Sequence, residues 1–284
     1  MRLFKFVNTK SCRVFMAILF TLLTGCGGGG GQDTILGTGG PSSNSLNVLM
    51  GSISSYGAFG GGAGLTNQGL NTSVQGDIGT TAACSLITGF TDLNNIPFTV
   101  TGLNNGAVSA NIYCDAPAPG TVATMALATK AASDALVDYN ALKNMTPSTS
   151  LGPVSGQLAG LTVPPGVYYA PSDAFVISTG NLTLDAKGDS NAVWIFQVPS
   201  SLTVGLIALP SSVLLINGGQ AKNVYWQVGS AARIEDGSSM IGTIIAKAGV
   251  TISTHNQTLQ TTLTGRAIGL NASVTMVNTT ITLP

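Results

Sequence analysis

Charged and metal-binding side chains are scarce in this sequence. Only 8% of its 284 residues are charged, Glu235 is its single glutamate and His255 is its single histidine. A Ser-His-Asp triad would have to use His255, which stands between Thr254 and Asn256, and no Gly-x-Ser-x-Gly motif accompanies it. With one histidine and no Cys-x-x-Cys pair, a zinc site also lacks ligands. We therefore expect no enzyme activity, no cofactor and no metal ion.

Two pairs of acidic residues are close in sequence: Asp185 with Asp189, and Glu235 with Asp236. Paired carboxylates can act as general acid and base or bind Ca²⁺ weakly. Such residues also accept hydrogen bonds from nearby backbone N–H groups in turns, and we favour this interpretation. Some right-handed β-helical proteins are polysaccharide lyases, whose grooves need clustered acidic residues with Arg or Lys as the base. Basic residues are sparse in this sequence, so we do not expect lyase activity.

Four of the eleven basic residues lie near the N-terminus, at Arg2, Lys5, Lys10 and Arg13. We expect this segment to be removed, which leaves seven basic residues against eleven acidic ones, a net charge of about −4. Nucleic acids are bound by basic surfaces, so the mature chain is not expected to bind them.

The N-terminus has the organisation of an export signal. The apolar run 14–23 follows the basic stretch, and about ten residues are too few to span a bilayer. Residues 23–26, Leu-Thr-Gly-Cys, resemble a bacterial lipobox. This resemblance implies a lipoprotein signal peptide over 1–25, with Cys26 as the lipidated first residue of an outer-membrane or cell-surface protein; the alternative is a chance cysteine beside a plain signal peptide. The Gly/Ser-rich segment 26–45 is predicted to be a flexible tether.

Cys84 and Cys114 are the two cysteines of the remaining chain, 30 positions apart. In an exported protein such a pair is expected to form a disulfide.

One pattern occurs four times in the C-terminal half, over 196–204, 226–234, 244–252 and 269–276. Each copy has a short apolar run, a corner of small residues, and a second run in which apolar and polar residues alternate. Alternation with period two gives a strand with one buried and one exposed face. Repeats without long amphipathic helices between them favour a β-solenoid, although a β-sandwich also has short strands and frequent turns.

The pattern also predicts a core, one helix and a cap. The core positions are Val176, Leu182, Leu184, Val193, Ile195, Leu202, Val204, Leu214, Val224, Ile234, Ile244, Ile252, Val274 and Met276. A helix is predicted over 121–143, with one face along the solenoid. This face consists of Val122, Met125, Thr129, Ala132, Leu136, Tyr139 and Lys143. Residues 80–119 depart from the strand pattern and are expected to form an irregular cap over one open end.

Several of these segments resemble the microbial ice-binding-like family. The matching motifs are 75–79, 165–168, 181–186, 193–197, 218–228, 242–246 and 265–267. The resemblance covers 46–284 and implies one domain: a discontinuous right-handed β-solenoid, triangular in section, with one α-helix packed alongside. It implies ice as the partner, and we expect a monomer.

Ice binding requires a flat array of small hydroxyl and methyl groups, which stacked strands about 4.8 Å apart supply. The repeats place three columns on the outward side: Ser201, Ala231, Gly249 and Ser273; Thr203, Arg233, Thr251 and Thr275; and Gly205, Glu235, Ser253 and Val277. The candidate contacts are Thr72, Ser201, Thr203, Thr251, Ser253, Ser273 and Thr275. Thr and Ser also favour exposed strand positions in general, and Arg233, Glu235 and Asp236 would place charges on this face. A surface adhesion or structural module without affinity for ice is therefore the alternative function.

Overall fold

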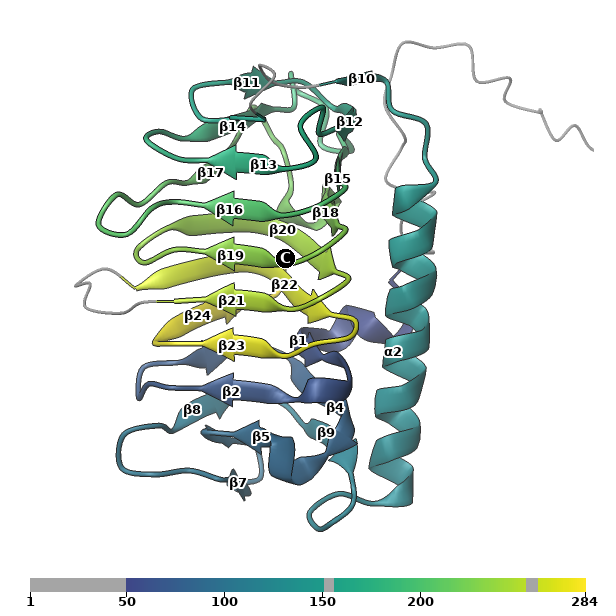
Figure 1. The fold of residues 1–284 in the computed structure, drawn as a ribbon, viewed down its shortest axis with the longest axis vertical. Coiled ribbons are helices and arrows are strands. Elements are labelled where there is room, and N and C mark those ends of the chain that lie inside the picture. The colour runs from purple at the N-terminus through teal and green to yellow at the C-terminus, as the bar shows by residue number, and fades with distance from the viewer. Residues whose placement is uncertain (1–49, 151–155, 254–259) are drawn as a thin grey trace, which may run out of the picture. The chain divides into compact units, whose positions relative to one another are not determined.

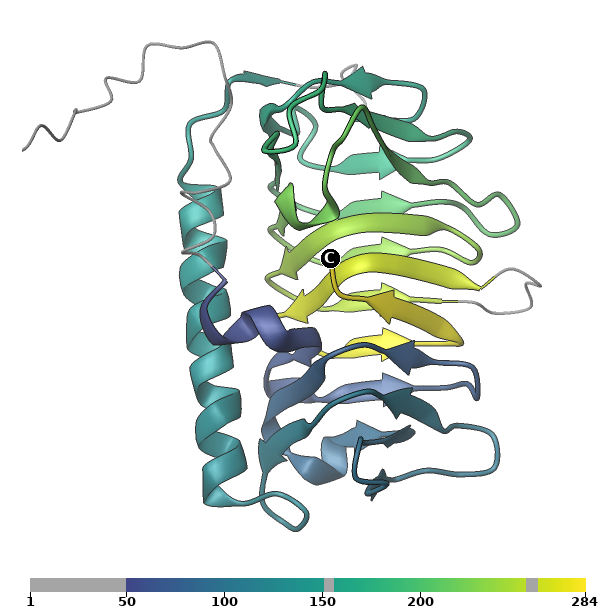
Figure 2. The ribbon, with the colours of Figure 1, turned by 180° about the vertical axis from the view of Figure 1, so that it is seen from behind.

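The computed structural model describes residues 50–150, 156–253 and 260–284, and for 149–150 it describes the backbone only. The described chain forms a β-solenoid with three faces and one long helix along its side (Figures 1 and 2). This architecture confirms the predicted fold class. The predicted signal peptide, tether, lipidation site at Cys26 and His255 lie outside the described residues.

Strands on the three faces stack along the solenoid axis, and all of them pair in parallel except β7. The helix-side face contains β10 (Thr149–Ser150), β12 (Gly166–Tyr169), β15 (Trp194–Val198), β18 (Val224–Val228), the second parts of β20 (Ser239–Ala246) and β22 (Thr261–Gly269), β1 (Tyr56–Gly60), β4 (Asp77–Ala83) and β9 (Ile112–Asp115). The second face, called here the threonine face, contains β13 (Phe175–Ile177), β16 (Leu202–Val204), β19 (Ala232–Ile234), β21 (Val250–Ile252), β23 (Val274–Met276), β2 (Leu65–Asn67) and β5 (Ile87–Thr88). The third face contains β11 (Thr162–Val163), β14 (Leu182–Asp185), β17 (Val213–Ile216), the first parts of β20 and β22, β24 (Thr279–Thr282), β3 (Ser73–Val74), β8 (Gly106–Val108), β6 (Phe90–Thr91) and β7 (Pro97–Phe98).

The order of the coils in space differs from their order in sequence. Strands β1, β2 and β3 each lie between a strand of the last coils and a strand of the next N-terminal coil: β1 between β22 and β4, β2 between β23 and β5, and β3 between β24 and β8. The long helix α2 (Val122–Lys143) carries the chain from the β9 end of the solenoid back to the β12 end (Figure 1). The solenoid is therefore discontinuous, as the family resemblance implied.

Helix α2 begins and ends at residues that satisfy its free backbone groups. Thr121 and Thr124 form a capping box, in which the Thr121 hydroxyl accepts from the Thr124 N–H at 3.1 Å and the Thr124 hydroxyl accepts from the Thr121 N–H at 2.8 Å. At the other end, the Gln197 side-chain amide donates to the carbonyls of Leu142 and Met145, both at 2.7 Å. These contacts agree closely with the predicted bounds of 121–143.

The predicted contact face of the helix was wrong by about one residue. Val122 and Leu136 are 89% and 51% exposed, and Thr129 and Lys143 are exposed as well. The helix instead rests on a face of mostly small residues: Ala128, Ala131, Ala135, Asp138, Tyr139 and Leu142. Large side chains from the sheet, including Phe59, Ile195 and Tyr225, already occupy the space beneath it. Only short side chains fit between helix and sheet.

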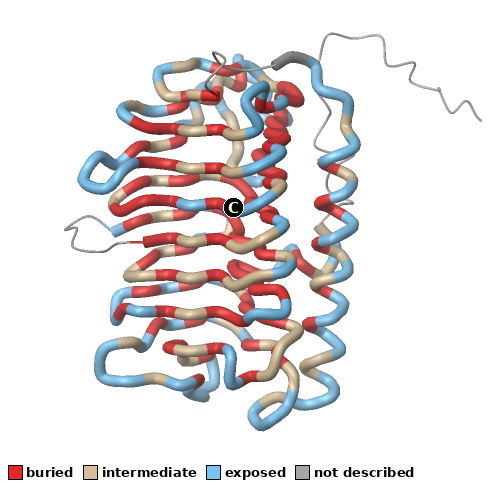
Figure 3. Tube along the Cα trace, viewed as in Figure 1, coloured by how far each residue is buried: buried red, intermediate tan, exposed pale blue. Residues whose placement is uncertain are grey.

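The core inside the solenoid contains a column of stacked aromatic rings. Phe196 and Trp226 stack with centroids 4.0 Å apart, Tyr168 also stacks on Phe196, and Phe175 packs edge-on against Phe196. Figure 3 shows the alternation of buried and less buried residues along the strands. Most predicted core positions are buried in this way.

Four predicted core positions lie elsewhere. Val176 is only partly buried and Leu214 is 41% exposed, because Phe175 and Val213 supply the inward side chains of those strands. Val193 and Ile195 are buried, but between the sheet and the helix. In these places the alternation was counted from the wrong residue.

The predicted cap, 80–119, is more regular than expected. It contains η3 (Cys84–Leu86) and strands β5, β8 and β9, which form one further coil, and β6 pairs with β7 in antiparallel fashion at the end. Cys84 and Cys114 form a disulfide with Cα atoms 5.0 Å apart.

The remaining short 3₁₀ turns are η1 (Gly51–Ser55), η2 (Gly61–Ala63) and η4 (Ala221–Asn223). Within the described ranges, no helix is long and apolar enough to cross a membrane.

Candidate functional site

The threonine face carries one continuous column of outward side chains across its seven strands. In order along the axis, the residues paired from strand to strand are Val176, Thr203, Arg233, Thr251, Thr275, Thr66 and Thr88. At about 4.8 Å per strand the column is about 29 Å long. The predicted register of Thr203, Arg233, Thr251 and Thr275 is thus the register of the structure.

The threonines of this column keep their hydroxyls free of the protein. All five are half-buried, and none of their side chains makes a hydrogen bond to another residue in the described part of the chain. The residues on either side of Thr203, Thr251 and Thr275 are apolar and buried in the core, and Thr66 lies between buried Leu65 and buried Asn67. Each strand therefore presents one methyl and one hydroxyl group to solvent from a fixed backbone.

A tight corner of small residues precedes strands β16, β19, β21, β23 and β2 of the column. Backbone N–H groups of Leu202, Ala232 and Val250 donate to the carbonyls of Ala231, Gly249 and Ser273, each belonging to the next corner. A Cβ atom on Gly249 would lie 2.3 Å from the carbonyl oxygen of Ser273, so this position admits only glycine. Ser201 and Ser273 are half-buried in these corners. Each stands two residues before a threonine of the column, so the predicted column of Ser201, Ala231, Gly249 and Ser273 lies beside the threonine column.

Arg233 is the single charged residue in the column, and its side chain is 46% exposed. Its guanidinium forms a bidentate ion pair with Glu235, in which Nη2 donates to Oε2 at 2.9 Å and Nε donates to Oε1. Hydrogen bonding to the Glu235 carboxylate raises the pKa of Arg233, and the nearby Asp236 carboxylate adds to this effect. The charge that interrupts the threonines is thus partly neutralised where it lies.

The third predicted column is not on the flat face. Glu235 and Ser253 are each 8% exposed and Asp236 is 4% exposed, because they turn inward at the corner after the strand. The Ser253 carbonyl accepts from the Thr261 hydroxyl at 2.5 Å inside this corner. Ser253 is therefore not an outward contact, and two of the three charges expected on the face are buried beside it.

Thr72 is also misplaced by the sequence prediction. It is 2% exposed, its hydroxyl donates to the side-chain oxygen of Asn67 at 2.6 Å, and it accepts from the Thr279 N–H at 3.1 Å. The Asn67 amide in turn donates to the carbonyls of Gly69 and Gly89. Thr72 belongs to a buried polar network at a solenoid corner and offers no surface to a ligand.

A family model described as Ice-binding-like matches residues 59–282. The chain belongs to the ice-binding-like family. A relative from Nostoc sp. (strain HG1) named "Ice-binding protein" is 36% identical over 203 residues, which cover 70% of this chain and 71% of the relative. Another protein of that name, from Colwellia sp., is 32% identical over 217 residues, 75% of each chain.

Solved structures similar to this ice-binding-like chain share its fold. The crystal structure of an ice binding protein from an Antarctic Biological Consortium has a TM-score of 0.66 and 26% identity, and the match covers 87% of this chain and 94% of that one. The ice-binding protein from the Antarctic ascomycete Antarctomyces psychrotrophicus has a TM-score of 0.64 and 27% identity, with 83% and 97% coverage.

Two threonines of the column were missed in the sequence. Thr66 and Thr88 extend the threonines of this ice-binding-like chain onto the N-terminal coils. The signal for Thr66 was present, because Ala63-Gly64-Leu65-Thr66 repeats the pattern of Ala248-Gly249-Val250-Thr251. Thr88 follows Leu86 and Ile87 without the small corner, and its sequence carries no comparable signal.

The third face is also open to solvent and carries hydroxyl groups. Thr262 and Thr264 on β22 pair with Thr280 and Thr282 on β24. The Thr262 hydroxyl donates to the hydroxyl of Ser239 on β20 at 3.0 Å. Beyond β22 the threonines end, because β20 and β17 present Ile241 and Leu214 instead. This face has a shorter threonine array than the threonine face, and it provides a natural comparison surface for experiments.

Proposed function

We propose that this protein binds ice through the threonine face. The observation that carries the proposal is the unbroken run of Thr88, Thr66, Thr275 and Thr251 in register on an uncovered parallel sheet. Their methyl groups hold water in an ordered arrangement, and their free hydroxyls can join it. The parallel sheet keeps the groups at a constant spacing of about 4.8 Å, so the ordered water can match a crystal lattice. The similarity to proteins named ice-binding supports the same function.

The scarcity of charge supports the proposal further. Ions hold hydration shells that do not fit an ice lattice, and Arg233 is the only charged side chain in the column. Its ion pair with Glu235 reduces the net charge presented to water. We expect Arg233 to weaken binding at the Thr203 end while four threonines at the other end make the principal contact.

The deciding experiment compares Thr251→Tyr with Thr264→Tyr in the protein lacking residues 1–26. Thr251 is half-buried on the threonine face and Thr264 is exposed on the third face, and both side chains point outward. Thr251→Tyr should remove most thermal hysteresis, because the ring lifts a flat crystal off its neighbours, and Thr264→Tyr should leave it unchanged. The free energy of unfolding should change by only about 0.5 kcal/mol in either variant.

Two results would contradict parts of this proposal, and a third would require another variant. If the unchanged protein at tens of micromolar neither shapes ice nor inhibits recrystallisation, ice binding is wrong and the adhesion or structural module is favoured. If Thr264→Tyr abolishes activity and Thr251→Tyr does not, the contact surface is the third face. If both variants lose activity together with stability, the substitutions have acted through the fold, and Thr251→Val, which keeps the shape, replaces Thr251→Tyr.

We also propose that the domain is attached to the outer membrane or cell surface of a bacterium through lipidated Cys26. The tether over 26–45 has a flexible composition, and about 20 residues of such chain extend about 25 Å on average. That reach allows the domain to present its face to ice while the lipid stays in the membrane. The role of the protein would then be to hold a cell near ice or to limit crystal growth around it.

A further inference from the structure

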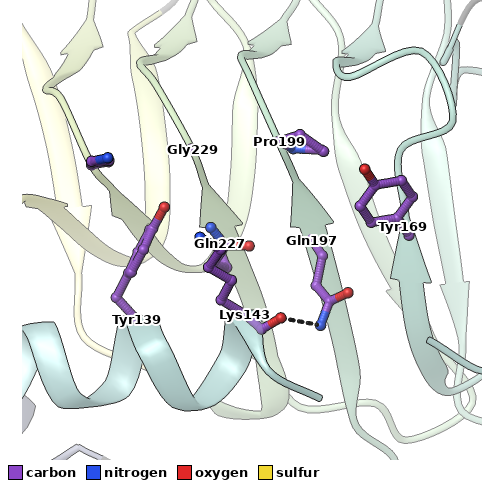
Figure 4. Close-up of a pocket in the computed structure, with 8 residues that line it drawn as sticks. Tyr139, Lys143, Tyr169, Gln197, Pro199, Gln227 and Gly229 are labelled. Atoms are coloured by element: carbon purple, nitrogen blue, oxygen red, sulfur yellow. Dashed lines mark hydrogen bonds between the residues drawn. The ribbon is translucent and has the colours of Figure 1, made fainter. Parts of the chain in front are cut away.

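A cavity of about 290 Å³ lies where helix α2 ends over the helix-side face. The side chains used below are Tyr139 and Lys143 from the helix, Tyr169, Gln197 and Gln227 from strands β12, β15 and β18, and Lys247 from the corner after β20. Figure 4 shows the two tyrosines on opposite sides of the two glutamines. The cavity is at the lower end of the size range of small-molecule sites. It lies apart from both uncovered faces, so it is not part of the ice surface proposed above.

Gln197 leaves one hydrogen-bond acceptor available in this cavity. The residue is 4% exposed, and its Nε2 donates to the carbonyls of Leu142, Lys143 and Met145 at 2.7, 3.3 and 2.7 Å. Its Oε1 accepts no hydrogen bond from a described residue, and it points toward Tyr169 (Figure 4). The same amide covers the carbonyls at the negative end of the helix dipole, which would otherwise repel an anion.

The charges around the cavity are positive. Lys143 and Lys247 are exposed, and neither forms an ion pair with a residue that the structure describes. Among the described residues that line the cavity there is no aspartate or glutamate. A concave surface with two ammonium groups and no carboxylate attracts anions, even though the mature chain carries net negative charge.

The aromatic rings distinguish this cavity from a simple anion site. Tyr139 is 5% exposed and fixed by the fold, whereas Tyr169 is 41% exposed and offers its ring to a ligand. Sugar rings lay their C–H faces on aromatic rings, and their hydroxyls bond to side-chain amides such as that of Gln197. A sugar carboxylate would pair with the lysines. We propose that the cavity binds one acidic sugar unit of a uronic-acid polysaccharide.

The proposal is tested by titrating trigalacturonate into the full-length protein, purified with whatever processing the cell has carried out. Isothermal titration at low salt should show saturable binding of trigalacturonate that weakens as salt is raised. The neutral trisaccharide maltotriose should bind far more weakly. Replacing both cavity lysines, Lys143→Gln with Lys247→Gln, should weaken trigalacturonate binding about tenfold, since each exposed ion pair contributes modestly.

Matched variants separate sugar recognition from general charge. Lys187→Gln with Lys222→Gln removes the same charge outside the cavity and should leave trigalacturonate binding unchanged. Tyr169→Ala should weaken trigalacturonate binding and leave any binding of inorganic phosphate unaffected. Absence of trigalacturonate binding at millimolar concentration, or equal weakening by the two lysine pairs, would overturn the proposal. Phosphate binding as tight as that of trigalacturonate, with no effect of Tyr169→Ala, would show a simple anion site and overturn it as well.

Discussion

Asp138 makes the stability of the helix–solenoid contact dependent on pH. The residue is 3% exposed in the interface beneath α2, and its Oδ2 has no hydrogen-bond partner among the described residues. Burial, together with the negative charge of Asp134, raises the pKa of Asp138 from 3.8 to about 7. Arg266, the one buried cation among the described residues, donates its hydrogen bonds to the Ser54 carbonyl and the Thr243 hydroxyl instead.

The sign of the effect follows from this raised pKa. Below about pH 3, Asp138 is protonated in both folded and unfolded chains and costs no stability. As the pH rises toward 7, the unfolded chain loses the proton and the folded chain keeps it, so stability falls by about 1.4 kcal/mol per pH unit. Above pH 7 the full penalty, about 4 kcal/mol, is present. Asp138→Asn cannot ionise, so it should be more stable than the unchanged protein by about 4 kcal/mol at pH 8 and by less than about 1 kcal/mol at pH 4.

Urea unfolding at pH 4, 6 and 8, followed by the fluorescence of buried Trp194 and Trp226, measures this difference. Asp134→Asn, one helical turn away, is the control. Although burial alone would raise the pKa of Asp134, hydrogen bonds from Ser52 and Lys130 lower it to about 2. Its carboxylate therefore stabilises the fold above about pH 4, and Asp134→Asn should destabilise at pH 8. A gap between the unchanged protein and Asp138→Asn that is the same at pH 4 and pH 8 would refute this reasoning.

Three further predictions concern the face, the disulfide and the anchor. Arg233→Thr with Glu235→Thr should raise thermal hysteresis while changing the free energy of unfolding by about 1 kcal/mol or less, because both members of the ion pair are removed together; unchanged or lower hysteresis would show that the charge does not weaken the face. Cys84→Ala with Cys114→Ala should lower the unfolding free energy by about 3.5 kcal/mol in urea titrations, and no loss would mean that this loop is already ordered in the unfolded chain. Cys26→Ala should abolish incorporation of labelled fatty acid and release the protein from the membrane; label on the variant would disprove lipidation at this cysteine.

Sequence alone predicted the part of the column from Thr203 to Thr275, because its four strands repeat the same local pattern. A run such as Ala272-Ser273-Val274-Thr275 specifies a corner, an inward apolar residue and an outward threonine without information from elsewhere. A local pattern does not show which strands lie beside the strand of Thr66. This residue lies beside Thr275, more than 200 positions away, and only the return of the chain along the helix brings them together.

The errors on the helix and at the corners have a different origin. Hydrophobic periodicity favours large apolar residues such as Leu136, but the contact beneath the helix admits only small ones such as Ala135. At the corner that holds Thr72, the buried side chain of Asn67 replaces strand alternation with a polar network. Periodicity records how apolar a position is and carries no information on how much space its neighbours leave.

The discontinuous order of the coils determines where this architecture can be extended. The C-terminal strand β24 lies between β22 and β3, so residue 284 lies partway along the solenoid and at neither end (Figures 1 and 2). A domain fused after residue 284 would therefore project from the side of the solenoid and leave both ends open. A longer threonine face requires extra coils, and these can be added only as internal insertions, beside β9 before the helix or beside β12 after it. Each insertion would lengthen the span that α2 must cross, so the helix sets the length of the threonine face.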